Sequence, residues 1–323
     1  MTFLINGVDY IKNHKNFDLI GRENDLNKLM TILVRKKSNS VLVVAPSGVG
    51  ASSVILGLQS IKNDINAPFD IVSKRLFFLD TDGLFGLGDN KLIDENFSKC
   101  IDVLEKTPNS VLVIEDAGDF YDSCKNSSLN HFINLINSKV KKQKFQVIFE
   151  INDKDFDKIL KWHSDFKEHY TMLDIREPSK DSLQLIIQKS AENLKEFHKI
   201  DISEESVHTV IELTQKYRVD GLDNSQPKRA INLLDQIVTS FKLKQHKNPK
   251  MGKEKFEDIQ QKIKIVYKNL REGERYIIEN EEKLADMIKE NEKSGEVKNI
   301  GFNSLVNGTA YFTPEMTELN KKT

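Results

Sequence analysis

The sequence predicts an α/β protein, in which a largely parallel sheet covered by helices is followed by a small all-helical lid domain and a helical C-terminal arm. In the first half, short apolar runs alternate with amphipathic stretches of helical period. After Glu177-Pro178-Ser179 the strand signals stop while helical periodicity continues. The chain has 323 residues, of which 38% are hydrophobic and 30% are charged, a composition that suits about two domains.

Four apolar runs predict the buried strands of the sheet, and each ends at polar, glycine-rich or acidic residues. They are residues 40–44, 75–79, 110–114 and 145–149. The stretches between them predict helices over residues 53–62, 92–104 and 129–141. In open parallel sheets ligands bind at the carboxyl ends of the strands, so the site is expected there.

The second half predicts helices alone, over residues 182–197, 203–217 and 227–244. Beyond Pro249 a heptad seam comprises Phe256, Ile259, Ile263, Val266, Leu270, Ile277, Leu284 and Met287. Gly273 and Asn280 interrupt this seam, which favours a helical hairpin and leaves a single docked amphipathic helix open. The predicted division is an N-terminal extension (1–16), an α/β domain (17–178), a lid domain (179–248), a helical or coiled-coil arm (249–293) and a tail (294–323).

Composition excludes several classes of protein. The longest apolar runs, 41–45 and 111–114, are far shorter than the roughly 18 residues of a membrane span, and no secretory signal precedes them. The 48 basic and 49 acidic residues give a net charge of −1, which argues against nucleic-acid binding. Cys100 and Cys124 lack metal-ligand spacing and predict reduced thiols in a cytoplasmic protein. Ser123 and Cys124 are expected in a polar loop without a nucleophile elbow.

The first strand leads into Ala45-Pro46-Ser47-Gly48-Val49-Gly50-Ala51-Ser52, which partly matches a phosphate loop, G-x-x-x-x-G-K-[ST]. Ala45 replaces the first glycine and Ala51 replaces the lysine. Backbone N–H groups can still wrap a phosphate, but the cation for the terminal phosphate is missing. The candidate phosphate-binding residues are Ser47, Gly48, Val49, Gly50, Ala51, Ser52 and Ser53. A glycine-containing turn that binds nothing is the alternative.

The third strand ends in Glu115 and Asp116, the place of a Walker B segment. These carboxylates are the candidate catalytic residues, and Ser52 with Glu115 is the candidate Mg²⁺ pair. The usual order, Asp then Glu, is inverted here. Asp116 is one methylene too short to reach the water that a Glu would polarise, so hydrolysis is in doubt. Two acidic residues that merely end a strand are the alternative.

Taken together, these segments resemble the first AAA+ module of the ClpA, ClpB and ClpC type of protein unfoldase. Ile20-Gly21-Arg22-Glu23 is similar to the segment that contacts adenine in that family, and Glu177-Pro178-Ser179 resembles the entry into its lid. Residues 226–235 resemble the proline-led last lid helix. The resemblance implies a nucleotide site that includes Ile20 and Gly21, with Arg229 as a cationic sensor and Asn152 as a polar sensor.

Several positions depart from that family's pattern. The two arginine fingers correspond to Glu168 and His169, and a carboxylate there would repel a neighbour's phosphates. The pore loop has Asp89 and Asn90 where an aromatic residue is expected, and Phe85 comes too early to replace it. No second ATPase module is recognised in the sequence.

These departures predict a catalytically degenerate AAA+ protein, a pseudo-ATPase. It would act as a structural or regulatory subunit of a protein assembly and bind ATP or ADP, with or without Mg²⁺, without efficient hydrolysis. The alternative is a slow AAA+ ATPase in a ring with itself or an intact paralogue, in protein remodelling or secretion. The expected partners are proteins, and an oligomer is one of the expected arrangements. Neither nucleic-acid binding nor a membrane span is expected.

Overall fold

The computed structural model describes residues 3–12, 17–64, 66–162, 169–216 and 225–247. It divides into two compact units, Met1–Asn193 with Asp220–Asn232, and Leu194–Val219 with Leu233–Thr323. The predicted arm and tail lie outside the described residues. None of the helices in the described ranges is long and apolar enough to cross a membrane.

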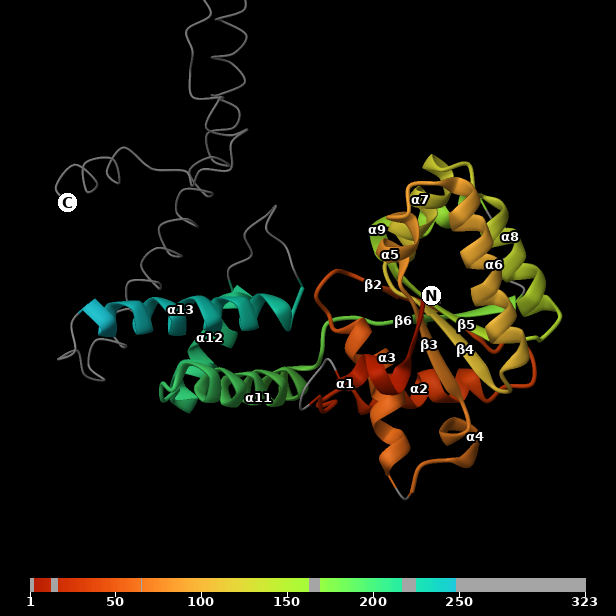
Figure 1. Ribbon diagram of the computed structural model, residues 1–323. Helices are drawn as coiled ribbons and strands as arrows, with labels where there is room; N and C mark the ends of the chain where they lie inside the picture. Colours follow the sequence, from red (N-terminus) through yellow and green to blue (C-terminus); the bar gives the residue numbers. More distant parts are fainter. Residues whose placement is uncertain (1–2, 13–16, 65, 163–168, 217–224, 248–323) are drawn as a thin grey trace, which may run out of the picture. The chain divides into compact units, whose positions relative to one another are not determined.

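The first unit contains a six-stranded sheet (Figure 1). Its strands are β1 (Leu4–Asn6), β2 (Ser40–Ala45), β3 (Arg75–Leu79), β4 (Ser110–Ile114), β5 (Gln146–Asn152) and β6 (Tyr170–Asp174), in the spatial order β1-β3-β4-β5-β2-β6. Every neighbouring pair is parallel except β1 with β3. The predicted parallel sheet is therefore confirmed, with β2, the strand that leads into the phosphate loop, between β5 and β6.

The helices of the first unit connect these strands. They are α1 (Gly7–Lys12), α2 (Glu23–Leu33), α3 (Ala51–Ser60), the 3₁₀ turn η1 (Ile61–Asn63), α4 (Phe69–Val72), α5 (Thr81–Phe85), α6 (Asn90–Lys106), α7 (Ala117–Asn126), α8 (His131–Lys141) and α9 (Asp153–Trp162). The expectation that Ser123 and Cys124 lie in a polar loop is wrong, because they lie in α7. Phe120, Tyr121 and Cys124 are buried on one face of this helix and hold it against the sheet.

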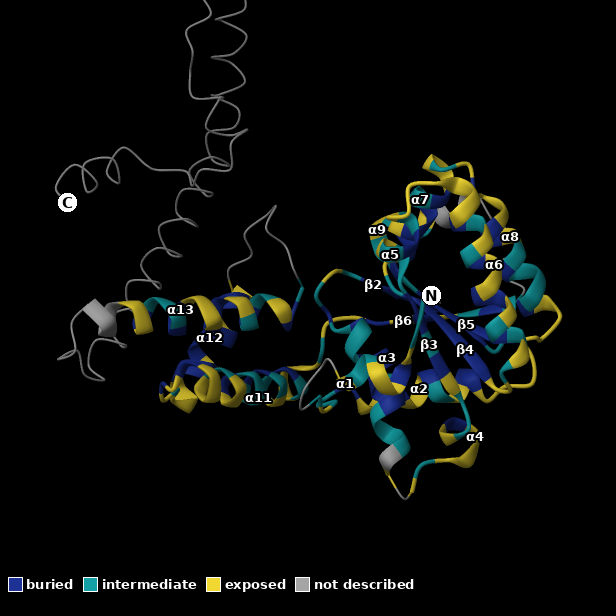
Figure 2. Cartoon of the chain, in the orientation of Figure 1, coloured by how far each residue is buried: buried dark blue, intermediate teal, exposed yellow. Residues whose placement is uncertain are grey.

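The core consists of two apolar layers, one on each face of the sheet (Figure 2). Along β2, Leu42 and Val44 belong to the layer that includes residues of α6, α7 and α8. Val41 and Val43 belong to the layer that includes residues of α2 and α3. Successive side chains of a strand point to opposite faces, and a parallel sheet is covered on both. This is why the strand segments are apolar throughout and were visible in the sequence.

The N-terminal segment, predicted only as an extension, supplies the edge strand β1 and helix α1. Leu4 lies opposite Leu79 in the antiparallel register. Tyr10 of α1 stacks on Phe78 of β3, with ring centroids 3.9 Å apart. A three-residue strand is too short to show a period, which explains why β1 was not predicted.

All three predicted lid helices are present, as α11 (Lys180–His198), α12 (Glu204–Lys216) and α13 (Lys228–Lys247). Within the second unit, α12 and the later part of α13 bury apolar side chains at helical spacing. They include Val207, Val210 and Ile211 of α12 and Leu234, Ile237, Val238 and Phe241 of α13. The His198 Nε2 atom lies 3.3 Å from Asp235 Oδ1 in the same unit.

Candidate functional site

The phosphate-loop segment forms a left-handed turn between β2 and α3. Gly48 and Gly50 have φ angles of +87° and +95°, and Gly50 is the N-cap residue of α3. A side chain at Gly50 would have room, but its backbone would be strained. Ala51 is buried at the first position of α3, followed by Ser52 and Ser53. The N-terminus of α3 therefore has the backbone form of an anion-binding helix start, but it lacks the lysine of a phosphate loop.

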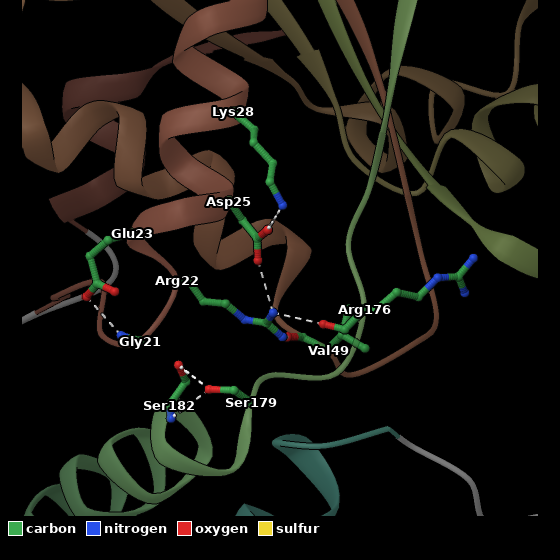
Figure 3. Close-up of polar contacts among 9 residues, drawn as sticks. All are labelled: Gly21, Arg22, Glu23, Asp25, Lys28, Val49, Arg176, Ser179 and Ser182. Atoms are coloured by element: carbon green, nitrogen blue, oxygen red, sulfur yellow. Dashed lines mark hydrogen bonds and ion pairs between the residues drawn. The ribbon is translucent and has the colours of Figure 1, made fainter.

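Arg22 holds this turn from the side of α2 (Figure 3). Its guanidinium is buried and donates to the backbone oxygens of Val49 at 2.5 Å and Arg176 at 2.8 Å, and to Asp25 Oδ2 at 3.1 Å. Burial lowers the pKa of Arg22, and Asp25 opposes that shift. Our sequence prediction did not include Arg22 in the site. The sequence did contain a signal for Arg22: it is a charged residue next to Gly21, in the segment that resembles an adenine-contacting one.

The Ile20-Gly21 segment lies against the first turn of α11. The Gly21 N–H donates to Glu23 Oε1 at 2.9 Å, and a Cβ added at Gly21 would lie 3.0 Å from the carbonyl oxygen of Ser182. Ser182 in turn donates its N–H to Ser179 Oγ (Figure 3). Ile20 is half-buried beside this close approach.

The start of α13 reaches the phosphate loop from the other side, within the first unit. The N–H of Ser225 donates to Ser47 O at 2.9 Å, and that of Lys228 donates to Gly48 O at 3.2 Å. The next residue, Arg229, was predicted as a sensor. Its backbone therefore lies next to a residue that contacts the phosphate loop.

Glu177 of the Glu-Pro-Ser segment binds the same helix start. Its Oε1 accepts from Arg229 Nη2 at 3.0 Å and from the N–H of Gln226 at 2.9 Å. The Nε and Nη1 atoms of Arg229 are buried and have no hydrogen-bond partner among the described residues. A cation with buried N–H groups that lack a partner among the described residues is suited to bind an anion.

Ser52 donates its hydroxyl hydrogen to Glu150 Oε1 at 2.8 Å. Glu150 lies on β5 opposite Val43 of β2. Burial raises the pKa of Glu150 to about 7; the charges of Glu115 and Asp116 add to the rise, and the bond from Ser52 opposes it. Our sequence prediction did not include Glu150. An acidic residue inside the apolar run Val147-Ile148-Phe149-Glu150-Ile151 was the signal for it.

The predicted catalytic carboxylates lie at the end of β4. Glu115 Oε2 accepts from the hydroxyl of Tyr10 at 2.5 Å. Burial, together with the bond to Glu115 and the nearby carboxylates, raises the pKa of Tyr10. Asp116 is the N-cap residue of α7, with a φ angle of +46°. Within the described residues no group of three or more His, Cys, Asp or Glu side chains is placed to hold a metal ion.

The predicted Mg²⁺ pair, Ser52 with Glu115, stays a prediction. In the structure Ser52 bonds to Glu150, and Glu115 accepts from Tyr10. Asn152 ends β5 opposite Ala45, and its Oδ1 accepts from the N–H of Lys154 at 3.1 Å. Its sensor role also stays a prediction.

The segment expected to carry a pore loop is used for local structure. Asp89 caps α6 by accepting from the N–H groups of Lys91 and Leu92, and Asn90 donates to Ser127 O. Phe85 packs on the core and against Phe120. Of the two arginine-finger positions, His169 is described, while Glu168 lies outside the described residues.

Comparison with models of known protein families shows the family of this chain. The profile described as Novel STAND NTPase 1 matches residues 9–216, well over half of the chain. The chain belongs to the Novel STAND NTPase 1 family. A second profile, described as an AAA lid domain, matches residues 179–291 of this STAND NTPase chain.

Curated relatives of this STAND NTPase include two Clp proteins. The chaperone protein ClpB of Aquifex aeolicus is 22% identical over 272 residues, which cover 84% of this chain and 26% of the relative. The ATP-dependent Clp protease ATP-binding subunit ClpC of Staphylococcus aureus is 23% identical over 250 residues, covering 77% and 30%. The chain therefore spans about a quarter to a third of the length of these relatives.

Solved structures give the same fold. A closed-state Hsp104 complex with ATPγS and FITC casein has a TM-score of 0.66 at 18% identity, over 76% of this chain and 41% of that one. The Saccharomyces cerevisiae Hsp104–ADP complex has a TM-score of 0.66 at 19% identity, with the same coverage. The STAND NTPase chain thus has the AAA+ fold, and its lid segment matches the AAA lid profile.

Proposed function

We propose that this chain is a catalytically degenerate AAA+ module that binds ATP or ADP without efficient hydrolysis and serves as a structural or regulatory subunit of a protein assembly. One observation carries the proposal. The turn around Gly50 and the start of α3 have the backbone form of a phosphate loop, while Ala51 is buried where the lysine would be. Backbone geometry for binding is present, and the side chain for charge stabilisation is missing.

Contacts around the loop support nucleotide binding. Arg22 fixes the Val49 carbonyl, and Ser225 and Lys228 bind the carbonyls of Ser47 and Gly48. Arg229 adds buried N–H groups without a hydrogen-bond partner among the described residues. Phosphate would be held by the loop and the N-terminus of α3, and the adenine would lie at Ile20 and Gly21. A bound nucleotide would supply negatively charged phosphate oxygens as acceptors for these N–H groups.

The environment of the carboxylates supports slow or absent turnover. Glu115 accepts a short hydrogen bond from Tyr10, which engages one of the two carboxylate oxygens that could serve a metal or an attacking water. Asp116 begins α7 in a left-handed conformation. The position of Glu168 carries a carboxylate instead of an arginine finger.

The proposed setting is an assembly with other proteins. The ClpC relative is named as the ATP-binding subunit of a protease, and one Hsp104 structure contains casein. By analogy we propose protein partners for this chain, among them a second copy or an intact AAA+ paralogue. We place it in the cytoplasm, which the two free, buried cysteines support.

The test combines ATP turnover with solution mass. We expect phosphate release by the purified chain with Mg²⁺ to equal that of the Glu115→Gln, Asp116→Asn double variant, while ADP or ATP raises the melting temperature of both. Turnover that the double variant abolishes would support the slow ATPase instead. A chain that stays monomeric and captures no AAA+ paralogue when the two are mixed would contradict the subunit role.

A further inference from the structure

The segments that lead into the parallel strands concentrate positive charge. β3, β4, β5 and β2 are parallel neighbours in the sheet, so all four begin at the same edge, away from the candidate site (Figure 1). The segments that enter them are residues 34–39, 73–75, 106–109 and 141–145, and none contains Asp or Glu. Their exposed basic residues form what we call the basic face: Arg35, Lys36, Lys37, Arg75, Lys106, Lys141, Lys142 and Lys144.

Hydrogen bonds join these four segments to one another. The side chain of Gln146, the first residue of β5, is buried; its Nε2 donates to Asn39 O at 2.7 Å, and its Oε1 accepts from Lys74 Nζ. The N–H of Arg75 donates to Asn109 O at 2.9 Å. The four segments are therefore held next to one another, and their charges belong to one surface.

Two half-buried lysines add charge close to this surface. Lys62 Nζ donates to Lys74 O at 2.5 Å and to Gln59 Oε1 at 3.0 Å, which are both neutral acceptors. Burial lowers the pKa of Lys62 to about 8 and also lowers that of Lys74, where the charge of Asp70 opposes the shift. An anion bound at the basic face would favour the charged form of both lysines.

Helix dipoles explain only part of the basic face. A cation in the last turn of a helix is stabilised by the negative end of the dipole. Lys106 and Lys141 lie in the last turns of α6 and α8. The other six residues of the face lie outside the helices, in loops or at the start of β3. Like charges gathered in this way repel one another, and an anionic partner would relieve that repulsion.

The net charge of −1 conceals this distribution, because it adds the basic face to an acidic region at the other edge of the sheet. Glu115 and Asp116 follow β4, Asp153 follows β5, and Asp174 ends β6. The expectation against nucleic acid rested on the sum of charges, which does not report where they lie. A polyanion would be attracted to one edge of the sheet and repelled from the other.

The composition of the face favours nucleic acid over a protein or a lipid surface. Six of its eight residues are lysines. Lysine is depleted in protein–protein interfaces, whereas interfaces with nucleic acid are strongly positive and wet. Peripheral binding to a bilayer adds apolar side chains that enter the lipid interface. Phe69 of α4 is exposed, but the exposed Asp70 next to it would be repelled by anionic lipid.

We propose that the basic face binds the phosphate backbone of nucleic acid without regard to base sequence. Lysine ammonium groups on four segments supply point charges for several phosphates, and contacts to phosphate carry no sequence information. The face is separate from the candidate nucleotide site, so this inference does not depend on the proposed nucleotide binding.

The experiment measures fluorescence anisotropy of labelled DNA and RNA duplexes, each in two unrelated sequences, titrated with the full chain. A face variant changes four lysines of the basic face: Lys36→Gln, Lys37→Gln, Lys142→Gln and Lys144→Gln. A matched control removes the same charge from four exposed lysines elsewhere: Lys91→Gln, Lys99→Gln, Lys125→Gln and Lys154→Gln. A thermal melt checks each protein, and the two pairs of the face variant are made separately if the fourfold change impairs folding.

We expect the wild type to bind both sequences of a duplex equally at about 50 mM NaCl. Affinity should fall by about a hundredfold between about 50 and about 200 mM NaCl, the salt dependence of about four phosphate contacts. The face variant should bind at least about tenfold more weakly at the lower salt concentration and depend less on salt. The control variant should stay within about twofold of the wild type.

Three outcomes would overturn the proposal. The first is no binding of either duplex by the folded wild type at about 50 mM NaCl. The second is an equal loss of affinity in the face variant and the control variant, which would reflect total charge and not this surface. The third is sedimentation with phosphatidylserine vesicles, lost in the face variant, without binding of DNA or RNA; it would make the face a lipid-binding surface.

Discussion

The two sides of the candidate site differ in what they retain. On the loop side, the backbone turn at Gly48 and Gly50, the N-terminus of α3 and the bond from Arg22 form a phosphate-loop shape. On the strand side, the carboxylates at the ends of β4 and β5 bond to groups of the protein, Glu115 to Tyr10 and Glu150 to Ser52. A binding shape and a reaction centre are thus separable, because backbone geometry depends on glycines and buttresses whereas chemistry depends on single side chains.

The largest expected effect tests the loop side. Gly50→Ala has room for its methyl group, since the nearest atom would be Ser53 Oγ at 3.9 Å, but it must adopt a φ of +95°. We expect the free energy of unfolding to fall by about 1–2 kcal/mol. Because the loop can relieve the strain only by rearranging, we also expect nucleotide affinity to fall by about a hundredfold, or about 2.8 kcal/mol.

Gly88→Ala is the matched control for that change. Gly88 also has a positive φ, +70°, and its added Cβ would have nothing within 4 Å. It should lose comparable stability and keep its nucleotide affinity. Equal affinity in both variants would show that the turn at Gly50 does not bind phosphate.

The next effect concerns the carboxylate of Glu150, whose Oε2 atom is buried. Its pKa in the folded chain is raised to about 7 from an ordinary value of 4.5, so the folded state holds the proton more tightly than the unfolded state. Its contribution to stability is therefore present at low pH and is lost as the pH rises from about 4.5 through about 7. Glu150→Gln does not titrate, and its stability should gain on the wild type by on the order of 1–3 kcal/mol between about pH 5 and pH 8.

Denaturant unfolding across that range measures the difference, and Glu95→Gln on the exposed face of α6, the matched control, should show none. Burying the amide of the Glu150→Gln variant can add a free-energy cost that does not depend on pH. Such a cost shifts the plot of unfolding free energy against pH by a constant amount and leaves its slope unchanged. A difference between wild type and Glu150→Gln that is flat with pH, or that shrinks as the pH rises, would contradict the burial argument.

Tyr10→Phe tests whether Glu115 is engaged by the fold. The phenyl ring keeps its stacking on Phe78 and loses the bond to the carboxylate. We expect a loss of about 1.5 kcal/mol in the free energy of unfolding, because hydrogen bonds to charged acceptors are the stronger ones. Tyr170→Phe, which loses a bond to the neutral Asn137, is the comparison and should cost about 1 kcal/mol. An unchanged unfolding midpoint in Tyr10→Phe would show that the bond from Tyr10 does not engage Glu115.

The smallest expected effect is at Arg229. Arg229→Gln removes the guanidinium, whose Nε and Nη1 atoms have no partner among the described residues, and nucleotide affinity should fall by about fivefold. Stability should change by less than about 1 kcal/mol, since the pair with Glu177 is partly exposed. Arg176→Gln, whose side chain is 60% exposed, is the control and should leave affinity unchanged. Similar titration curves for both variants would argue against a sensor role for Arg229.

Much of the fold could be predicted from the sequence, since buried parallel strands such as β4 are uniformly apolar and the lid helices keep their period. β1 was not predicted, because a strand of three residues has no pattern to detect. The loop residues Ser47 to Ser53 were recognised by their spacing. Glu150 and Tyr10 were not, since their roles depend on which strands become neighbours, and β5 comes nearly 100 residues after Ser52. Contacts of this kind join segments that are far apart in the sequence, so no short stretch of residues predicts them.

The most direct test of nucleotide binding by the loop is a calorimetric titration of the wild-type chain with ADP and Mg²⁺. The account predicts one site per chain with a dissociation constant on the order of micromolar, which corresponds to about −8.2 kcal/mol. No heat of binding and no rise in melting temperature would contradict it and would make the turn at Gly50 a structural connection between β2 and α3.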